Sequence, residues 1–311
     1  MELCDGFTMP AAERETLPGF YLAMTGEKLT FEERLQTAGP ECDPYVIFAT
    51  VCMVRDTLKE LTVQGHILTE GDLTDPSFTI PVHNLYLDAR PDVYANLRVL
   101  TLGAAADSAK CRLDPALLDA ICKLQKLEEF TIIGYIIDEN HPHRPTWQSP
   151  VGSSSITKLV IVDVNIDFSR LRLLVSSCKA LKNFFYQPEE WSPVYPDLLE
   201  SLSSLSNHAD TLQAFHLDIR HITISTPSLA SHYIDLSSFT KLTDLRIPYF
   251  LLVPRTTYDL NFSLTQFRTY CPPNIRKDGF EIYQVGISLR GRFYPVGCRN
   301  ISAFQRLVDS L

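Results

Sequence analysis

The chain has 311 residues, of which 45% are hydrophobic and 21% are charged, and its formal net charge at pH 7 is -9. This composition is that of a folded protein and excludes the low-hydrophobicity, high-charge class of disordered chains. The 28 Lys and Arg residues form no basic run, and no apolar stretch approaches the roughly 18 residues of a spanning helix, so we expect neither nucleic acid nor a membrane as the partner.

Residues 1–42 form an N-terminal segment without the features of an export signal. Glu2 and Asp5 stand where such a signal carries positive charge, and no continuous apolar run follows them. We therefore expect a cytoplasmic or nuclear protein. The eight cysteines include no CxxC pair, so they are expected to be reduced thiols, buried as small apolar side chains.

From residue 58 onward, one short phrase recurs: an apolar residue, two variable residues, an apolar residue, one variable residue and a further apolar residue. From Leu97 to Leu242 its first position recurs at intervals of 30, 29, 25, 31 and 30 residues. This even spacing is close to that of helix-containing leucine-rich repeats, and chance matches would not show it. The seven triads are Leu58/Leu61/Val63, Leu97/Leu100/Leu102, Leu127/Phe130/Ile132, Ile156/Leu159/Ile161, Leu181/Phe184/Tyr186, Leu212/Phe215/Leu217 and Leu242/Leu245/Ile247.

Stretches of helical period precede several of these phrases. An Asp-Pro pair at 114–115 opens LDPALLDAICKL, and this pair is typical of a helix start. The segments FSRLRLLVSSCKAL and YPDLLESLSSL each place their apolar residues on one stripe. The sequence therefore predicts a helical segment before Leu58, Leu127, Leu181 and Leu212.

These units predict an α/β fold, namely a leucine-rich-repeat-like solenoid of irregular strand-plus-helix repeats. One unit cannot bury its apolar strand face alone, whereas stacked units form a parallel sheet on one side and a helical layer on the other. We assign the array to residues 43–285 and a C-terminal cap to residues 286–311. Residues 70–95, which contain VHNLYL, are expected to be an insertion or an extra strand.

The segments ITKLVIVDVNIDFSRLRLLVSSCKALKNFFYQ, YPDLLESLSSLSNHADTLQAFHLDI and DLSSFTKLTDLRIPYFLL resemble the repeat region of filamentous-fungal F-box and leucine-rich-repeat proteins, over roughly residues 95–280. The resemblance implies a repeat fold that holds a partner, and an N-terminal F-box that recruits a cullin-type ubiquitin ligase. At Leu17-Pro18 the chain continues with GFYLAMTGEKLT instead of the acidic, leucine-rich run of an F-box. Residues 1–42 are accordingly expected to be poorly ordered or a degenerate F-box remnant.

Candidate groups for chemistry are few. His141 and His143 follow Asp138 and Glu139, but a metal site needs three or four convergent ligands and no second cluster accompanies them. No nucleophile elbow, phosphate loop, dinucleotide fingerprint or zinc-protease motif occurs. We therefore assign no catalytic, cofactor-binding or metal-ligating residue, and an enzyme whose site forms only from distant residues remains a third hypothesis.

The variable positions of each phrase are expected to face away from the helices, because side chains alternate across a strand. Val160 and Phe185 are large apolar residues at such positions, where a partner's apolar anchor would dock inside a charged rim. The alternative is that a shift of register or an overlying loop buries them. The predicted partner-binding residues are Glu129, Lys158, Val160, Val162, Phe185, His216, Asp244 and Arg246.

The sequence favours a non-enzymatic scaffold that binds another protein on the open strand face and needs no cofactor. The alternative, implied by the resemblance, is a substrate receptor of a cullin-type ubiquitin ligase. A packed helical trio within residues 1–40 would favour this alternative.

Overall fold

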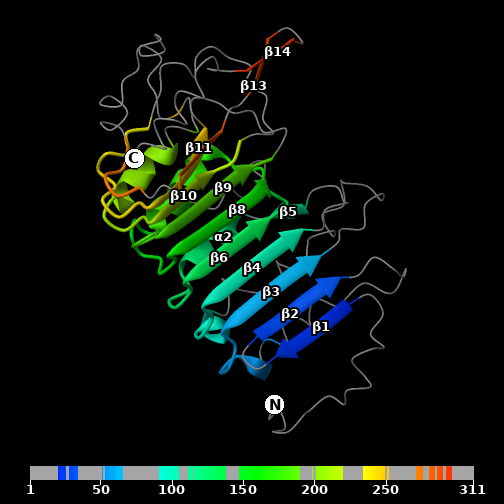
Figure 1. Cartoon of the computed structure of the whole chain (residues 1–311). Coiled ribbons are helices and arrows are strands. Elements are labelled where there is room, and N and C mark those ends of the chain that lie inside the picture. Colours follow the sequence, from blue (N-terminus) through cyan, green and yellow to red (C-terminus); the bar gives the residue numbers. More distant parts are fainter. Residues whose placement is uncertain are drawn as a thin grey trace.

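The structure is a computed structural model and describes residues 20–25, 28–33, 51, 53–65, 91–104, 111–113, 115–137, 147–189, 198, 201–219, 234–248, 251, 271–275, 280–283, 286–289 and 292–295. Within these ranges a ten-stranded sheet dominates, with helical segments against one of its faces (Figure 1). The predicted α/β class is therefore confirmed.

The strands of the large sheet lie side by side in chain order (Figure 1). The first two are antiparallel, and every neighbouring pair from the second strand onward is parallel. In spatial order they are β1 (Phe20–Thr25), β2 (Lys28–Glu33), β3 (Glu60–Gly65), β4 (Val99–Ala104), β6 (Glu129–Ile133), β8 (Lys158–Val164), β9 (Asn183–Pro188), β10 (Ala214–Leu217), β11 (Asp244–Pro248) and β12 (Phe280–Tyr283).

Two small sheets lie outside this order. β5 (Cys111–Leu113) pairs in parallel with β7 (Tyr135–Ile137). β13 (Gly286–Leu289) and β14 (Arg292–Pro295) form an antiparallel pair. In the region assigned to the C-terminal cap, the described residues therefore form a pair of their own, while β12 continues the large sheet.

Three helical segments stand where the periodicity predicts them: α2 (Pro115–Cys122) precedes β6, α3 (Phe168–Ser177) precedes β9, and the 3-10 helix η4 (Ser203–His208) precedes β10. A further 3-10 helix, η3 (Pro91–Tyr94), precedes β4 and was not predicted, since residues 70–95 were expected to be an insertion or an extra strand. Proline occupies the first position of α2, where its missing N–H costs no hydrogen bond. α3 is capped by the carboxylate of Asp167, which accepts a hydrogen bond from the backbone N–H of Ser169 (3.1 Å).

The apolar triads form the core. All 21 of their side chains are buried, with at most 3% of any of them exposed. Their middle residues are partners across neighbouring strands from β3 to β11, in the order Leu61, Leu100, Phe130, Leu159, Phe184, Phe215 and Leu245. Because the triads share one register, one face of the sheet is continuously apolar.

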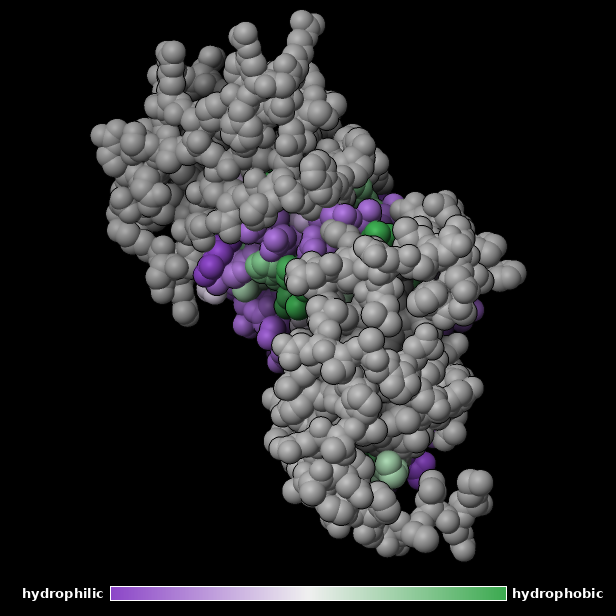
Figure 2. All heavy atoms as spheres, turned by 90° about the vertical axis from the view of Figure 1, so that its right-hand side faces the viewer, coloured by the Kyte–Doolittle hydropathy of each residue, from purple (hydrophilic) through white to green (hydrophobic). Residues whose placement is uncertain are grey.

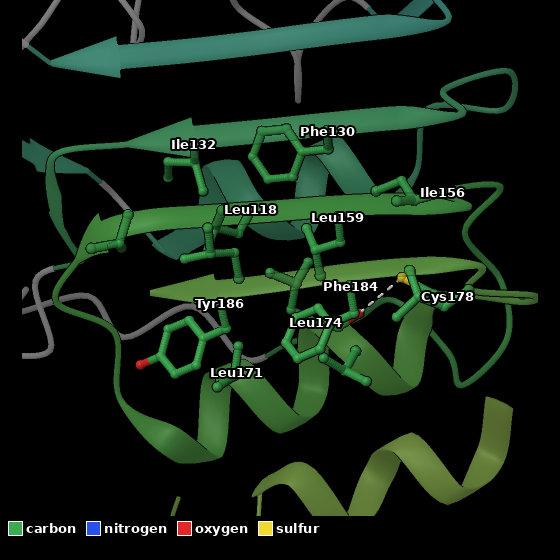
Figure 3. Close-up of a cluster of buried hydrophobic side chains, with 14 of the residues drawn as sticks. Leu118, Phe130, Ile132, Ile156, Leu159, Leu171, Leu174, Cys178, Phe184 and Tyr186 are labelled. Atoms are coloured by element: carbon green, nitrogen blue, oxygen red, sulfur yellow. Dashed lines mark hydrogen bonds between the residues drawn. The ribbon is translucent and has the colours of Figure 1, made fainter. Parts of the chain in front are cut away.

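The helices cover this apolar face. Leu171 and Leu174 of α3 are fully buried and point toward Phe184 and Tyr186 of β9 (Figure 3). Leu118 of α2 is buried in the same way. The predicted helical stripes therefore meet the predicted strand faces.

Backbone hydrogen bonds also join the turns that lead into neighbouring strands. The backbone carbonyl of Glu128 accepts hydrogen bonds from the N–H groups of Thr157 (2.8 Å) and Lys158 (3.0 Å), which open the next strand. The carbonyls of Lys59, Arg98, Thr157, Lys182 and Gln213 accept two N–H groups in the same way. The strand starts are thus aligned along one edge of the sheet.

The described part of the N-terminal segment consists of two strands. Residues 20–25 and 28–33 form a hairpin whose second strand extends the sheet beyond β3. The described part of residues 1–42 contains these two strands and no helix. Residues 66–90, including VHNLYL, and residues 138–146, including His141 and His143, lie outside the described residues.

Candidate protein-binding face

The side of the sheet turned away from the helices is here called the outer face. It is formed by the residues that alternate with the buried triads, and most of these are partly exposed. One row of strand partners is Thr62, Thr101, Thr131, Val160, Phe185, His216 and Arg246, and a second is Glu60, Val99, Glu129, Lys158, Asn183, Ala214 and Asp244. Strand pairing therefore brings residues about 30 positions apart into contact distance.

All eight residues predicted to bind a partner lie on the outer face. Each is partly or largely exposed, whereas the flanking triad residues are buried. Val160 and Phe185 are adjacent partners of β8 and β9, and Val162 lies two residues beyond Val160 on the same side. The shift of register considered as an alternative would have buried these side chains in the core, and it does not occur.

A small apolar patch occupies the middle of the outer face. It consists of Ile133, Val160, Val162 and Phe185, in which Ile133 pairs with Val162 and Val160 pairs with Phe185. The sequence reasoning missed Ile133, although its place directly after the triad residue Ile132 in β6 was the available signal. Figure 2 shows hydrophobic and hydrophilic atoms of described residues side by side on one side of the molecule.

Charged side chains flank the apolar patch. On one side, Lys158 Nζ lies 2.8 Å from Glu129 Oε2. On the other side, Asp244 Oδ1 lies 2.9 Å from His216 Nε2 and 3.5 Å from Arg246 Nε. The contact between His216 and Asp244 is short but is not aligned as a hydrogen bond, because neither of these atoms has a hydrogen-bond partner.

Phe185 links the apolar patch to the group formed by His216, Asp244 and Arg246. Its ring meets the imidazole of His216 edge-on, with ring centroids 6.0 Å apart and planes at 77°. Such an arrangement is favourable for neighbouring aromatic rings. Phe185 is therefore held between Val160 on β8 and His216 on β10, which gives the patch a defined shape.

The end of β8 is bent beside the patch. The pairing of β8 with β9 shifts between Val162 and Val164, and Asp163 adopts a positive φ of 54°. A bulge of this kind changes the direction in which the neighbouring side chains point. Val162 is thus the last residue of β8 that continues the row of Val160 on the outer face.

The buried thiols lack the character of nucleophiles. Cys122, Cys178 and Cys271 are free and buried, as expected for cysteines that act as small apolar side chains. Burial raises the pKa of the Cys178 thiol to about 12 and raises the pKa of Cys122 and Cys271 as well. These thiols therefore stay protonated at neutral pH, and the thiolate is the reactive form.

His208 is a structural residue rather than a site residue. Only 2% of it is exposed. Its Nδ1 accepts a hydrogen bond from the backbone N–H of Leu181 (3.4 Å), and Nε2 lies 3.0 Å from the carbonyl oxygen of Val175. Because Nδ1 accepts while Nε2 must donate to that carbonyl, the ring is neutral, and it links η4 to α3 and to the turn before β9.

We expect His208 to make the protein less stable at mildly acidic pH. Burial lowers its pKa, although the hydrogen bond to Val175 acts in the opposite direction. Below the ordinary histidine pKa of about 6.5 the unfolded chain takes up a proton that the native state excludes, so the free energy of unfolding falls as pH falls. Urea unfolding from about pH 7.5 to about pH 5 should show this decline in the native chain and a shallower one in His208→Gln. Equal slopes would contradict the assignment.

No model of a known protein family matches the chain, and no curated protein matches it at a significant level. No helix in the described part of the chain has the length and apolar character that crossing a bilayer requires. The described residues hold no group of three His, Cys, Asp or Glu side chains arranged for a metal ion.

Proposed function

We propose that the chain is a leucine-rich-repeat-like solenoid and acts as a non-enzymatic scaffold whose outer face binds another protein. The solenoid is supported by the parallel order of the strands from β2 to β12 and by the common register of the triads. A helical segment before each of several strands supports it further. In such arrays the curved strand surface is the usual binding surface.

The single observation that carries the binding proposal is the apolar patch between two charged groups. Ile133, Val160, Val162 and Phe185 are large apolar side chains on a face that the described helices do not cover. Protein interfaces place aromatic and aliphatic anchors at the centre and polar groups at the rim. The pairs Lys158–Glu129 and His216–Asp244 stand at such rim positions.

The test is a pull-down with the intact chain from a lysate of a filamentous fungus, the source of the proteins whose repeats the sequence resembles. Val160→Asp/Phe185→Asp places two charges in the apolar patch and is expected to lose the partner, with an affinity loss of at least about 100-fold, because each buried charge costs several kcal/mol. The matched control is Thr62→Asp/Thr101→Asp, which introduces the same two charges in the same row on β3 and β4 and should retain the partner. Circular dichroism checks the fold of both variants.

The outcomes separate the hypotheses. Retention of the partner by Val160→Asp/Phe185→Asp would contradict the outer face as the binding site, and loss in both variants would contradict the apolar patch as its centre. Capture of a cullin-type ubiquitin-ligase subunit by the intact chain and by both variants would favour the substrate-receptor alternative. Direct titration of the captured partner, once purified, then measures the loss of affinity in each variant.

A further inference from the structure

The edge of the sheet at which the strands begin is a continuous surface of stacked turns. We call it the turn rim, and it comprises residues 55–59, 95–98, 123–128, 151–157, 179–182, 209–213 and 240–243. Side chains join one turn to the next: Ser155 Oγ donates a hydrogen bond to the carbonyl of Gln125 (2.6 Å), and Thr211 Oγ1 donates to that of Leu181 (2.9 Å). Asn96 and Thr243 make bonds of the same kind between turns, and Lys126 Nζ donates to the side-chain Oδ1 of Asn96 (2.7 Å).

The turn rim is basic although the chain as a whole is acidic. It carries eight basic and three acidic residues, a local excess of five positive charges in a chain whose formal net charge is -9. The basic residues are Arg55, Lys59, Arg98, Lys123, Lys126, Lys179, Lys182 and Lys241, and the acidic ones are Asp56, Glu128 and Asp210. Because strand pairing collects these residues on one edge, the charge is concentrated in space although it is dispersed in sequence.

Part of this charge is neutralised within the chain. Arg55 lies 3.8 Å from Asp56, Arg98 lies 3.5 Å from Glu128, and Lys123 lies 2.7 Å from Asp119. The exposed side chains of Lys179, Lys182 and Lys241, in contrast, have no acidic partner among the described residues. Three lysines without an acidic partner in the described part of the chain therefore lie in the turns before β9 and β11.

We propose that the turn rim binds an acidic peptide segment, whose carboxylates pair with Lys179, Lys182 and Lys241. This second surface is separate from the apolar patch and has its own ligand class. Charge complementarity alone is met by any anionic ligand, and the composition of the turn rim favours a peptide over nucleic acid. No residue of the turn rim is aromatic, whereas proteins that bind single-stranded nucleic acid stack bases on aromatic side chains.

The probe is a fluorescein-labelled peptide of alternating glutamate and glycine, titrated with the intact chain and followed by fluorescence anisotropy. Lys179→Glu/Lys182→Glu replaces attraction by repulsion and is expected to weaken binding about tenfold or more at about 50 mM salt. Raising the salt to about 500 mM should weaken binding to the native chain as well. The matched control is Arg170→Glu/Arg172→Glu on the neighbouring α3, which changes the net charge equally away from the rim and should stay within about threefold of the native chain.

Equal losses in the two double variants would overturn the proposal, because net charge alone would then explain the binding. Failure of the native chain to bind the peptide, or tighter binding of single-stranded DNA of equal charge, would also overturn it. A loss confined to Lys179→Glu/Lys182→Glu would support it. None of the substituted residues belongs to the outer face, so failure here leaves the proposed function standing.

Discussion

Replacing Phe184 with alanine is expected to lower the free energy of unfolding by about 3–5 kcal/mol. Phe184 is 1% exposed and lies in the middle of the array. Its ring stacks near those of Phe215 and Tyr186, with centroids 5.9 and 6.4 Å away, and it faces Leu174 of α3 (Figure 3). Truncation removes the transfer free energy of the ring and leaves a cavity that neighbours on three strands and a helix cannot fill. Urea unfolding followed by circular dichroism measures the loss.

The adjacent residue provides the control. Phe185 is of the same type but lies on the outer face, where it is partly exposed and contacts His216 at its edge. Phe185→Ala is therefore expected to cost about 1 kcal/mol, the contribution of an aromatic pair. If the two variants lost similar stability, the assignment of the two faces of β9 would be wrong. The contrast tests the strand register at the apolar patch directly.

Replacing Asp119 with alanine is expected to cost about 2–4 kcal/mol. Asp119 lies on α2 and is 7% exposed. Its Oδ1 accepts hydrogen bonds from the backbone N–H groups of Gln148 (3.1 Å) and Ser149 (2.7 Å), and its Oδ2 lies 2.7 Å from Lys123 Nζ. Alanine leaves the buried N–H of Ser149 without this acceptor, which costs its desolvation free energy.

The control for this prediction is Asp119→Asn, which retains an oxygen acceptor of the same shape and should lose only about half as much stability. Acid titration adds a second readout. Burial alone would raise the pKa of Asp119, but hydrogen bonds from Lys123, Ser149 and Gln148 together lower it. The stabilisation is thus complete above the ordinary aspartate pKa of about 3.9 and is lost as pH falls through the lower folded value. The free energy of unfolding of Asp119→Ala should therefore decline less steeply than that of the native chain as the pH falls below the ordinary aspartate pKa. An equally steep decline in the two proteins would contradict the stabilising role of Asp119.

Asp119 and His208 share a structural role that no sequence pattern indicates. Asp119 ties α2 to residues 148–149 of the following segment, and His208 ties η4 to the end of α3 and to the turn before β9. Each polar group is buried and joins segments about 30 residues apart. The hydrogen bonds of Asp119 and His208 fix the positions of neighbouring helices and turns, while the apolar triads provide most of the buried apolar surface.

Among the described residues, the predictions of strand and helix faces that depended on local periodicity were confirmed. The alternation within KLVIVDV is enough to place Leu159 and Ile161 in the core and Val160 and Val162 on the opposite side, because side chains alternate along a strand whatever its neighbours are. The helical stripe of Phe168, Leu171 and Val175 is local in the same sense. The hairpin of residues 20–33 was missed, because it lies outside the evenly spaced phrases that identified the other strands.

The sequence by itself therefore determined the α/β class, the buried triads and the side of the sheet on which the eight candidate residues lie. Only the tertiary structure decided which of these residues are neighbours: it paired Ile133 with Val162, set His216 against Asp244 and aligned the lysines of separate turns along one edge. The physical reason is that the side of the sheet toward which a side chain points follows from the dihedral angles of its own strand. Contacts between strands follow from the register of hydrogen bonds between segments about 30 residues apart, which no local pattern encodes.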